Sequence, residues 1–294
     1  MDGKETNVLE VKNLCKTFRQ SEFALNNVSF TLPSGAIMGF VGGNGAGKTT
    51  TLGCILGTLK KDSGLVKLFG EEVIGNDIDV DIKEQIGVAY DASNFSGELT
   101  PQRLAKIMQG IYRQWDQDVY LQYLERFHLP LNQKISTFSK GMTMKLAIAV
   151  AVSHSARLLV LDEVTSGLDP IVRDEVLDIF LDFVQDESRS ILISSHITSD
   201  LEKVADYITF IHDGKILLSA SIDDLRYKYG IARCKSEQFE QMHKEDVVSY
   251  IEKDYQVDVL VSDRDNILKK YGSLTMDNAL IDDILMLLVR GKKK

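Results

Sequence analysis

The chain has 294 residues, of which 44% are hydrophobic and 26% are charged, and these near-average proportions exclude a disordered or collagen-like protein. Its formal net charge of −9 repels phosphate backbones, which argues against general coating of nucleic acid. The widely spaced Cys15, Cys54 and Cys234 form neither a metal cluster nor a disulfide framework, which fits a reducing compartment.

The apolar stretches of the chain are short. Residues 146–152 and 284–289 are examples, whereas a membrane-spanning helix needs roughly 20 apolar residues. The first residues, Met-Asp-Gly-Lys-Glu, lack the basic start and apolar middle of a signal peptide. We therefore expect a cytoplasmic protein that reaches a membrane only through a partner chain.

The N-terminal third is expected to be rich in strands. Apolar residues alternate or form short runs there, and one run stops at a glycine-rich loop. The pattern predicts, in order, strands at 8–11, 28–32 and 37–41, a helix at 47–58, and strands at 64–69 and 86–90.

The apolar period changes between Asp91 and about Ser155. From 100 to 127 apolar residues recur at helical spacing, as Leu104, Met108 and Ile111 illustrate, and 139–152 is also helical in pattern. This predicts a mainly α-helical insertion between strands.

An alternation of strands and helices then returns, which indicates a largely parallel sheet. The pattern predicts a strand at 158–161, a helix at 170–184, a strand at 191–194 and a hairpin of 208–211 with 215–218. From about residue 221 the chain is richer in charge. Its alternating valines at 257, 259 and 261 and an apolar helix face at 279–288 predict a small α+β appendage.

A phosphate-binding loop follows the run at 37–41. Its residues match G-x-x-x-x-G-K-[ST] between a strand and a helix, which is the context this motif requires. They are Gly42, Gly43, Asn44, Gly45, Ala46, Gly47, Lys48 and Thr49, followed by Thr50. Glycines let amide groups turn toward phosphate oxygens, and the helix N-terminus adds partial positive charge. Lys48 is expected to reach the β- and γ-phosphates and Thr49 to bind Mg²⁺. The alternative is a glycine-rich turn with a chance lysine.

Two carboxylates end the apolar run at 158–161. Asp162 is expected to hold Mg²⁺ through water beside the loop, and Glu163 to orient and polarise the attacking water. The alternative is an edge strand with surface acids.

One histidine lies just after a predicted strand of the α/β part. His196 comes after 191–194, and the carboxyl ends of such strands line the ligand crevice. It is therefore expected to reach the γ-phosphate and the water. The remaining histidines have no such context and are expected to be structural: His128, His154, His212 and His243.

Together these residues resemble the ATP-binding subunits of ABC transporters over roughly residues 7–220. Further positions match segments that this family uses around the nucleotide. They are Phe18, where an aromatic stacks on adenine; Ser139, Lys140 and Gly141, where the signature Leu-Ser-Gly-Gly-Gln stands; Asp169, which ends the D-loop; and His196, at the switch histidine. The alternatives are a core aromatic for Phe18 and an ordinary helix N-cap for the serine of the signature segment.

The resemblance implies an α/β fold with a P-loop ATPase core and an N-terminal antiparallel β subdomain. The nucleotide-binding domain would span 1–220, with a helical subdomain at about 92–155, and the appendage 221–294. It also implies a head-to-tail dimer, homomeric or heteromeric, with two ATP molecules and Mg²⁺ at the interface. Each ATP would touch the phosphate loop of one subunit and the signature segment of the other. Closing and opening of this dimer would drive a separate transmembrane permease.

Two residues depart from the family pattern. Lys140 replaces the second signature glycine, and Asp91 replaces a glutamine that contacts Mg²⁺ in the family. Since a carboxylate oxygen is also a hard ligand, Asp91 is expected to contact Mg²⁺, the alternative being a solvated loop acid. Both changes and the appendage resemble the bacterial multidrug and bacitracin-resistance exporters.

Two other functions stay open. One is a soluble ABC-type ATPase of DNA repair or translation, although such proteins usually carry two nucleotide domains or a long coiled coil. The other is a nucleotide-sensing regulator with little hydrolysis, against which Glu163 and His196 argue. Co-purification with a membrane protein would separate the exporter subunit from both.

Overall fold

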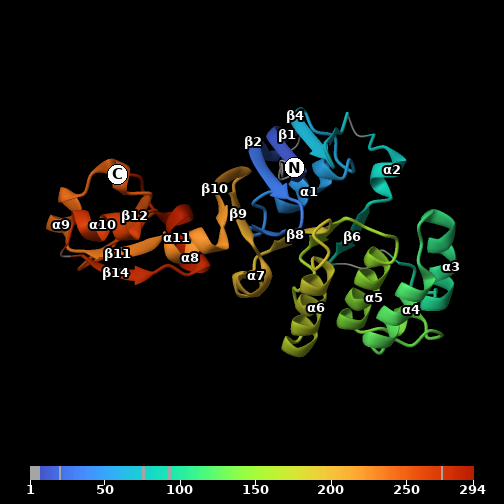
Figure 1. Ribbon diagram of the computed structural model, residues 1–294. Helices are drawn as coiled ribbons and strands as arrows, with labels where there is room; N and C mark the ends of the chain where they lie inside the picture. Colours follow the sequence, from blue (N-terminus) through green and yellow to red (C-terminus); the bar gives the residue numbers. More distant parts are fainter. Residues whose placement is uncertain (1–6, 20, 75–76, 92–94, 273) are drawn as a thin grey trace, which may run out of the picture.

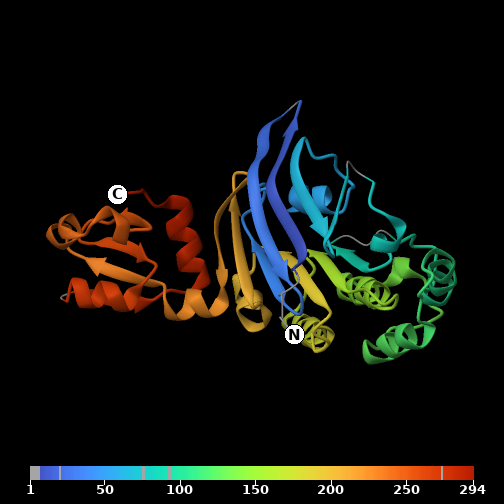
Figure 2. The ribbon, with the colours of Figure 1, turned by 45° about the horizontal axis from the view of Figure 1, so that its top comes forward.

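The computed structural model describes residues 7–19, 21–74, 77–91, 95–272 and 274–294. Within these residues the strands form three sheets, and helices cover the central one. Figures 1 and 2 show the C-terminal part, coloured orange to red, at the opposite end of the molecule from the green helices. None of the helices in the described ranges has the length and apolar character that crossing a bilayer requires.

The central sheet has the strand order β10-β9-β3-β8-β7-β6, and it is parallel apart from the β9–β10 hairpin. Its strands are β3 (Ile37–Val41), β6 (Ile86–Tyr90), β7 (Leu158–Asp162), β8 (Ser190–Ser195), β9 (Tyr207–His212) and β10 (Lys215–Ser221). The predicted parallel sheet and hairpin are therefore confirmed.

Both faces of the central sheet are covered, which explains why its strands are continuous apolar runs. Helix α1 (Lys48–Ile55) packs on one face with Met38 and Phe40. Ile37 and Val41 point to the other face. That face is covered by α5 (Lys140–Val152), α6 (Pro170–Phe183) and α7 (Thr198–Val204).

An antiparallel sheet of order β2-β1-β4-β5 covers α1 from outside. Its strands are β1 (Asn7–Phe18), β2 (Ser21–Pro33), β4 (Ser63–Leu68) and β5 (Glu71–Glu72). The long strands β1 and β2 were predicted only in part. Register shifts interrupt their pairing near Leu14, and Asn13 and Asn27 have positive φ, so the alternation breaks within each strand.

The predicted helical insertion is confirmed, but it is divided more finely than the apolar period indicated. It contains α3 (Pro101–Ile111), α4 (Gln117–Arg126), a 3₁₀ turn at Ile135–Thr137 and α5, after the short α2 (Val80–Lys83). The segment with helical spacing at 100–127 forms two helices, because Asp116 caps the second by accepting bonds from the amides of Asp118 and Val119.

His154 joins this insertion to the central sheet, which supports a structural role. Its Nδ1 lies 3.2 Å from the Val150 carbonyl oxygen and its Nε2 3.1 Å from that of Ile86. The ring also stacks on Tyr112 at 3.9 Å between centroids. Burial lowers the pKa of His154, although the two carbonyl groups oppose this shift.

The C-terminal part is a third sheet of order β12-β13-β11-β14, flanked by helices. Its elements are α8 (Ile222–Tyr227), β11 (Gly230–Cys234), α9 (Ser236–Gln241), a 3₁₀ turn at Lys244–Asp246, β12 (Ser249–Glu252), β13 (Val257–Val261), α10 (Arg264–Lys270), β14 (Thr275–Asn278) and α11 (Ile281–Arg290). The strand predicted from the alternating valines and the terminal helix are both present.

Helix α11 docks on α7, which follows His196. The Thr198 hydroxyl donates to Oδ1 of Asp282 at 2.6 Å, and the Ile281 amide donates to Oε1 of Glu202 at 3.1 Å. Ile281 and Leu201 also belong to one apolar cluster. The C-terminal part therefore packs against α7 of the preceding part of the chain, in addition to being covalently connected to it.

Candidate functional site

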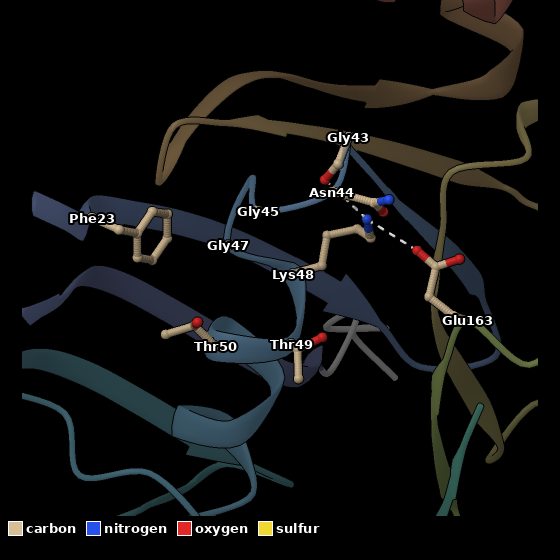
Figure 3. A pocket seen from close by; sticks show the side chains of 9 residues that line it. All are labelled: Phe23, Gly43, Asn44, Gly45, Gly47, Lys48, Thr49, Thr50 and Glu163. Atoms are coloured by element: carbon tan, nitrogen blue, oxygen red, sulfur yellow. Dashed lines mark hydrogen bonds and ion pairs between the residues drawn. The ribbon is translucent and has the colours of Figure 1, made fainter. Parts of the chain in front are cut away.

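The site lies at the carboxyl edge of the central sheet. Val41 at the end of β3 pairs with Ser195 of β8, and Asp162 at the end of β7 pairs with Ser194 of the same strand. Parallel strands end on the same side, so the loop after β3 and the residues after β7 and β8 meet there. Figure 3 shows the loop, Lys48 and Glu163 around a common pocket.

The glycine-rich loop encloses the ammonium group of Lys48. Nζ of Lys48 donates to the carbonyl oxygens of Gly42 at 2.6 Å and Gly43 at 3.2 Å, and the side chain is 7% exposed. Gly47 has a φ of 114°, and a side chain on Gly42 would lie 2.4 Å from the Ile211 carbonyl oxygen. Both positions therefore require glycine for the loop to keep this curve.

Three charged or titratable side chains form a continuous polar chain beside the loop. Nζ of Lys48 lies 3.0 Å from Oε1 of Glu163, as an ion pair. Oε2 of Glu163 lies 2.6 Å from Nδ1 of His196. Glu163 has a φ of 55°, a backbone conformation that costs a residue with a side chain about 1–3 kcal/mol and is concentrated at functional sites. The structure thus brings Lys48, Glu163 and His196 together as expected.

A second set of contacts joins the first turn of α1 to β7. The Thr49 hydroxyl donates to Oδ2 of Asp162 at 2.8 Å, and the Ser194 hydroxyl donates to Oδ1 of the same carboxylate, which is 7% exposed. Hydroxyl and carboxylate oxygens suit Mg²⁺. No cluster of three or more His, Cys, Asp or Glu side chains that could hold a metal occurs within the described ranges. A Mg²⁺ ion here would therefore take further ligands from phosphate and water.

The pocket above the loop has a volume of about 430 Å³, within the usual range for ligand sites. The lining residues are Phe23, Gly43, Asn44, Gly45, Gly47, Lys48, Thr49, Thr50 and Glu163. Most of the predicted phosphate-loop residues thus line one cavity.

The aromatic ring at this pocket is that of Phe23, which the sequence reasoning missed. A side chain on Gly47 would lie 3.1 Å from Cζ of Phe23 and 2.8 Å from Leu25, so β2 presents both residues to the loop. The available signal was the two-residue spacing of Phe23 and the buried Leu25, which puts them on one face of a strand. Phe18, the predicted stacking residue, lies 6.4 Å from Phe23 between ring centroids and is not among the residues that line the pocket, and its stacking on adenine stays a prediction.

The substitution Phe23→Ala is expected to weaken the binding of ATP and the binding of GTP to a similar degree. Stacking on an aromatic ring contributes about 1–3 kcal/mol and tolerates different bases, so the loss should be about fivefold or more. The matched variant Phe18→Ala removes the neighbouring ring and is expected to lower the affinity for nucleotide less than Phe23→Ala does. Titration of a fluorescent nucleotide measures both. A greater loss in Phe18→Ala would place the base on that ring instead, and a loss confined to ATP would mean that other groups read the adenine edge.

The residues of the predicted signature segment and D-loop do not line this pocket. They gather at the starts of two neighbouring helices, where Oγ of Ser139 accepts from the Met142 amide at 3.2 Å and caps α5. Asp169 caps α6 by accepting from the Val172 amide at 3.1 Å. Capping is an ordinary structural role, so these bonds by themselves assign no nucleotide contact.

Asp91 and Lys140 contact each other. Asp91 directly follows Tyr90, which pairs with Asp162, so it lies at the same sheet edge as the pocket. Its Oδ1 is 2.5 Å from Nζ of Lys140. A contact of Asp91 with Mg²⁺ stays a prediction.

Comparison with known proteins agrees with this geometry. The family model described as ABC transporter matches residues 25–166. The bacitracin transport ATP-binding protein BcrA of Bacillus licheniformis is 31% identical over 277 residues, which cover 93% of this chain and 88% of that protein. The lantibiotic transport ATP-binding protein SrtF of Streptococcus pyogenes is 34% identical, covering 74% of this chain and 92% of that protein.

Solved structures show the same fold. One is the ATP-binding subunit of an ABC transporter, which is 27% identical and has a TM-score of 0.65. The match covers 74% of this chain and 92% of that subunit. The dimeric cassette MJ0796 bound to ADP and Pi also has a TM-score of 0.65. At 21% identity over 73% of this chain and 98% of that chain, it supports the fold alone.

Proposed function

The chain belongs to the ATP-binding proteins of ABC transporters, and on this premise we propose that it drives a membrane exporter whose permease is a separate chain. As a member of this family it binds and hydrolyses ATP. The observation that carries the exporter assignment is the BcrA match, because it spans 93% of the chain and so includes the C-terminal part. The name of SrtF, a lantibiotic transport ATP-binding protein, supports a transport-coupled function as well.

In the proposed reaction the ammonium group of Lys48 leaves its ion pair with Glu163 and binds the β- and γ-phosphate oxygens of ATP. Glu163 then accepts a proton from a water molecule, whose oxygen forms a bond to the γ-phosphorus while the bond to the ADP oxygen breaks. Nδ1 of His196 lies 2.6 Å from Oε2 of Glu163 and keeps that carboxylate oriented. The same imidazole would donate a hydrogen bond to the γ-phosphate. Thr49 and Asp162 would hold Mg²⁺, which neutralises charge on the phosphates.

The proposed assembly is a head-to-tail dimer, homomeric or heteromeric, with two ATP molecules between its subunits. The signature and D-loop residues do not line the pocket of their own subunit, and we assign them to the nucleotide of the partner subunit; they are Ser139, Lys140, Gly141 and Asp169. The closed dimer forms around ATP, and hydrolysis reopens it. These movements drive the permease, through which the chain is held at the inner face of the cell membrane.

The proposed domain boundary lies at residue 220. Residues 1–220 form the nucleotide-binding domain, which includes the helical subdomain at about 92–155, and residues 221–294 form the appendage. The separate sheets support this division, because β10 ends the central sheet at Ser221 and β11 begins another.

Affinity capture from detergent-solubilised membranes tests the exporter assignment. The tagged chain is expected to retain a polytopic membrane protein, and purified ATPase activity is expected to change when that protein is present. The variant Lys48→Ala serves as a control, since permease capture should survive the loss of ATP turnover. An active ATPase that stays in the supernatant and captures no membrane protein would instead indicate a soluble ATPase.

A further inference from the structure

The two residues that depart from the family pattern form one ion pair. Nζ of Lys140 lies 2.5 Å from Oδ1 of Asp91, and the two side chains are 46% and 48% exposed. They come from different parts of the fold, since Asp91 follows β6 of the central sheet and Lys140 is the first residue of α5. A glutamine and a glycine could not make this contact, because neither carries a charge. The two departures are therefore complementary in charge and in position.

The contacts around Lys140 extend to the loop between β7 and α6. A side chain on Gly167, which has a φ of 69°, would lie 3.1 Å from Nζ of Lys140. One on Gly141 would lie 3.4 Å from Cγ1 of Val172. The start of α5 thus packs closely on Gly167 and on the start of α6, and the Lys140 side chain passes Gly167 to reach Asp91.

The ion pair lies at the N-terminal end of α5 and restrains the position of that helix end. Ser139 directly precedes Lys140; its Oγ accepts from the Met142 amide at 3.2 Å and its carbonyl oxygen from the Thr143 amide at 2.9 Å. A helix N-terminus attracts anions, but only over a short distance, so its placement decides whether it can contact a phosphate. An anchor one residue from the cap limits that placement.

We propose that the Asp91–Lys140 ion pair positions the Ser139 end of α5 for the ATP bound to the partner subunit. This inference rests on the dimer proposed above. Asp91 and Lys140 act as positioning residues, because each works through the placement of Ser139 and its helix end. The pair also neutralises the Asp91 carboxylate, which lies at the sheet edge where phosphates bind.

Amide hydrogen exchange in the nucleotide-free protein tests the anchor. Asp91→Asn and Lys140→Met are each expected to speed exchange at the Met142 and Thr143 amides about twofold to fivefold, the scale of a half-exposed ion pair. The charge-swapped double variant, Asp91→Lys with Lys140→Asp, is expected to return these rates to within about twofold of the parent. The matched control is Lys134→Met, which breaks the exposed pair with Glu98 and should leave both amides unchanged.

Dimerisation tests the consequence for ATP. In a Glu163→Gln parent, which is expected to retain ATP, each single change is expected to raise the dimer dissociation constant about fourfold to twenty-fivefold, since a homodimer contains two such pairs and the effect of one pair is squared. Sedimentation with and without ATP measures this, and the charge-swapped variant should restore the dimer. If thermal melting shows that the swapped variant does not fold, Lys140→Arg replaces it, because arginine keeps the positive charge. The dimer dissociation constant of Lys140→Arg should lie within about twofold of that of the parent, unlike that of Lys140→Met.

Two results would overturn the proposal. Unchanged exchange at Met142 and Thr143 in both single variants would mean that the pair anchors nothing. A swapped variant with normal exchange but no ATP-dependent dimer would mean that Lys140 contacts the phosphate or Asp91 contacts Mg²⁺ directly, and that neither acts through the end of α5. If the Glu163→Gln parent shows no dimer, the proposed assembly is wrong, whereas the exchange experiment still decides the role of the pair.

Discussion

The substitution Lys48→Ala is expected to abolish ATP hydrolysis and to weaken ATP binding by about 10²-fold or more. Each hydrogen bond to a charged group contributes about 1.5–3 kcal/mol, and Lys48 is positioned to make two of them, to the β- and γ-phosphates. The loop carbonyl groups of Gly42 and Gly43 already hold this ammonium at the base of the pocket. The substitution also leaves Glu163 without its ion-pair partner, so a carboxylate then faces the incoming phosphates.

Isothermal titration with ATP and a phosphate-release assay measure the two effects of Lys48→Ala. The matched control is Lys12→Ala, which removes the same charge from an exposed site on β1. It should leave both quantities unchanged and so exclude an effect of net charge. ATP binding by Lys48→Ala within about twofold of the parent would count against the assigned loop.

The substitution Glu163→Gln is expected to lower hydrolysis by about 10²-fold or more while ATP binding is kept, the usual scale for a positioned base. Glutamine has the same shape, and its carbonyl oxygen can still accept from His196, so the polar chain beside the loop keeps its geometry. It cannot accept the proton of the attacking water. Removal of the negative charge 3.0 Å from Lys48 also frees that ammonium for phosphate.

Because ATP stays uncleaved, Glu163→Gln should hold the dimer closed. Size-exclusion chromatography with ATP is expected to show more dimer than the parent chain, and the excess should vanish without nucleotide. The control Glu175→Gln removes a carboxylate that pairs with Lys145 and does not line the pocket. Turnover in Glu163→Gln close to that of the parent would show that another group activates the water.

The parts of the protein that depend on neighbouring residues in the chain could be predicted from its sequence. The phosphate loop is one, because Gly42 to Thr49 are consecutive and the motif contains both its curvature and its charge. The central strands are another, because burial on both faces leaves a continuous apolar run with little ambiguity. Asp162, Glu163 and His196 were found because each lies at the carboxyl end of such a strand, and parallel strands end on one side of a sheet.

The tertiary structure was needed to identify the contacts between residues that are far apart in the chain. It placed Phe23 rather than Phe18 at the pocket, because the twist and register of the β1–β2 hairpin determine which ring faces Gly47. It paired Asp91 with Lys140, which the sequence presented only as two separate departures from a pattern. Such contacts depend on how helices and sheets pack and on the rotamer of each side chain, and the local order of residues specifies neither.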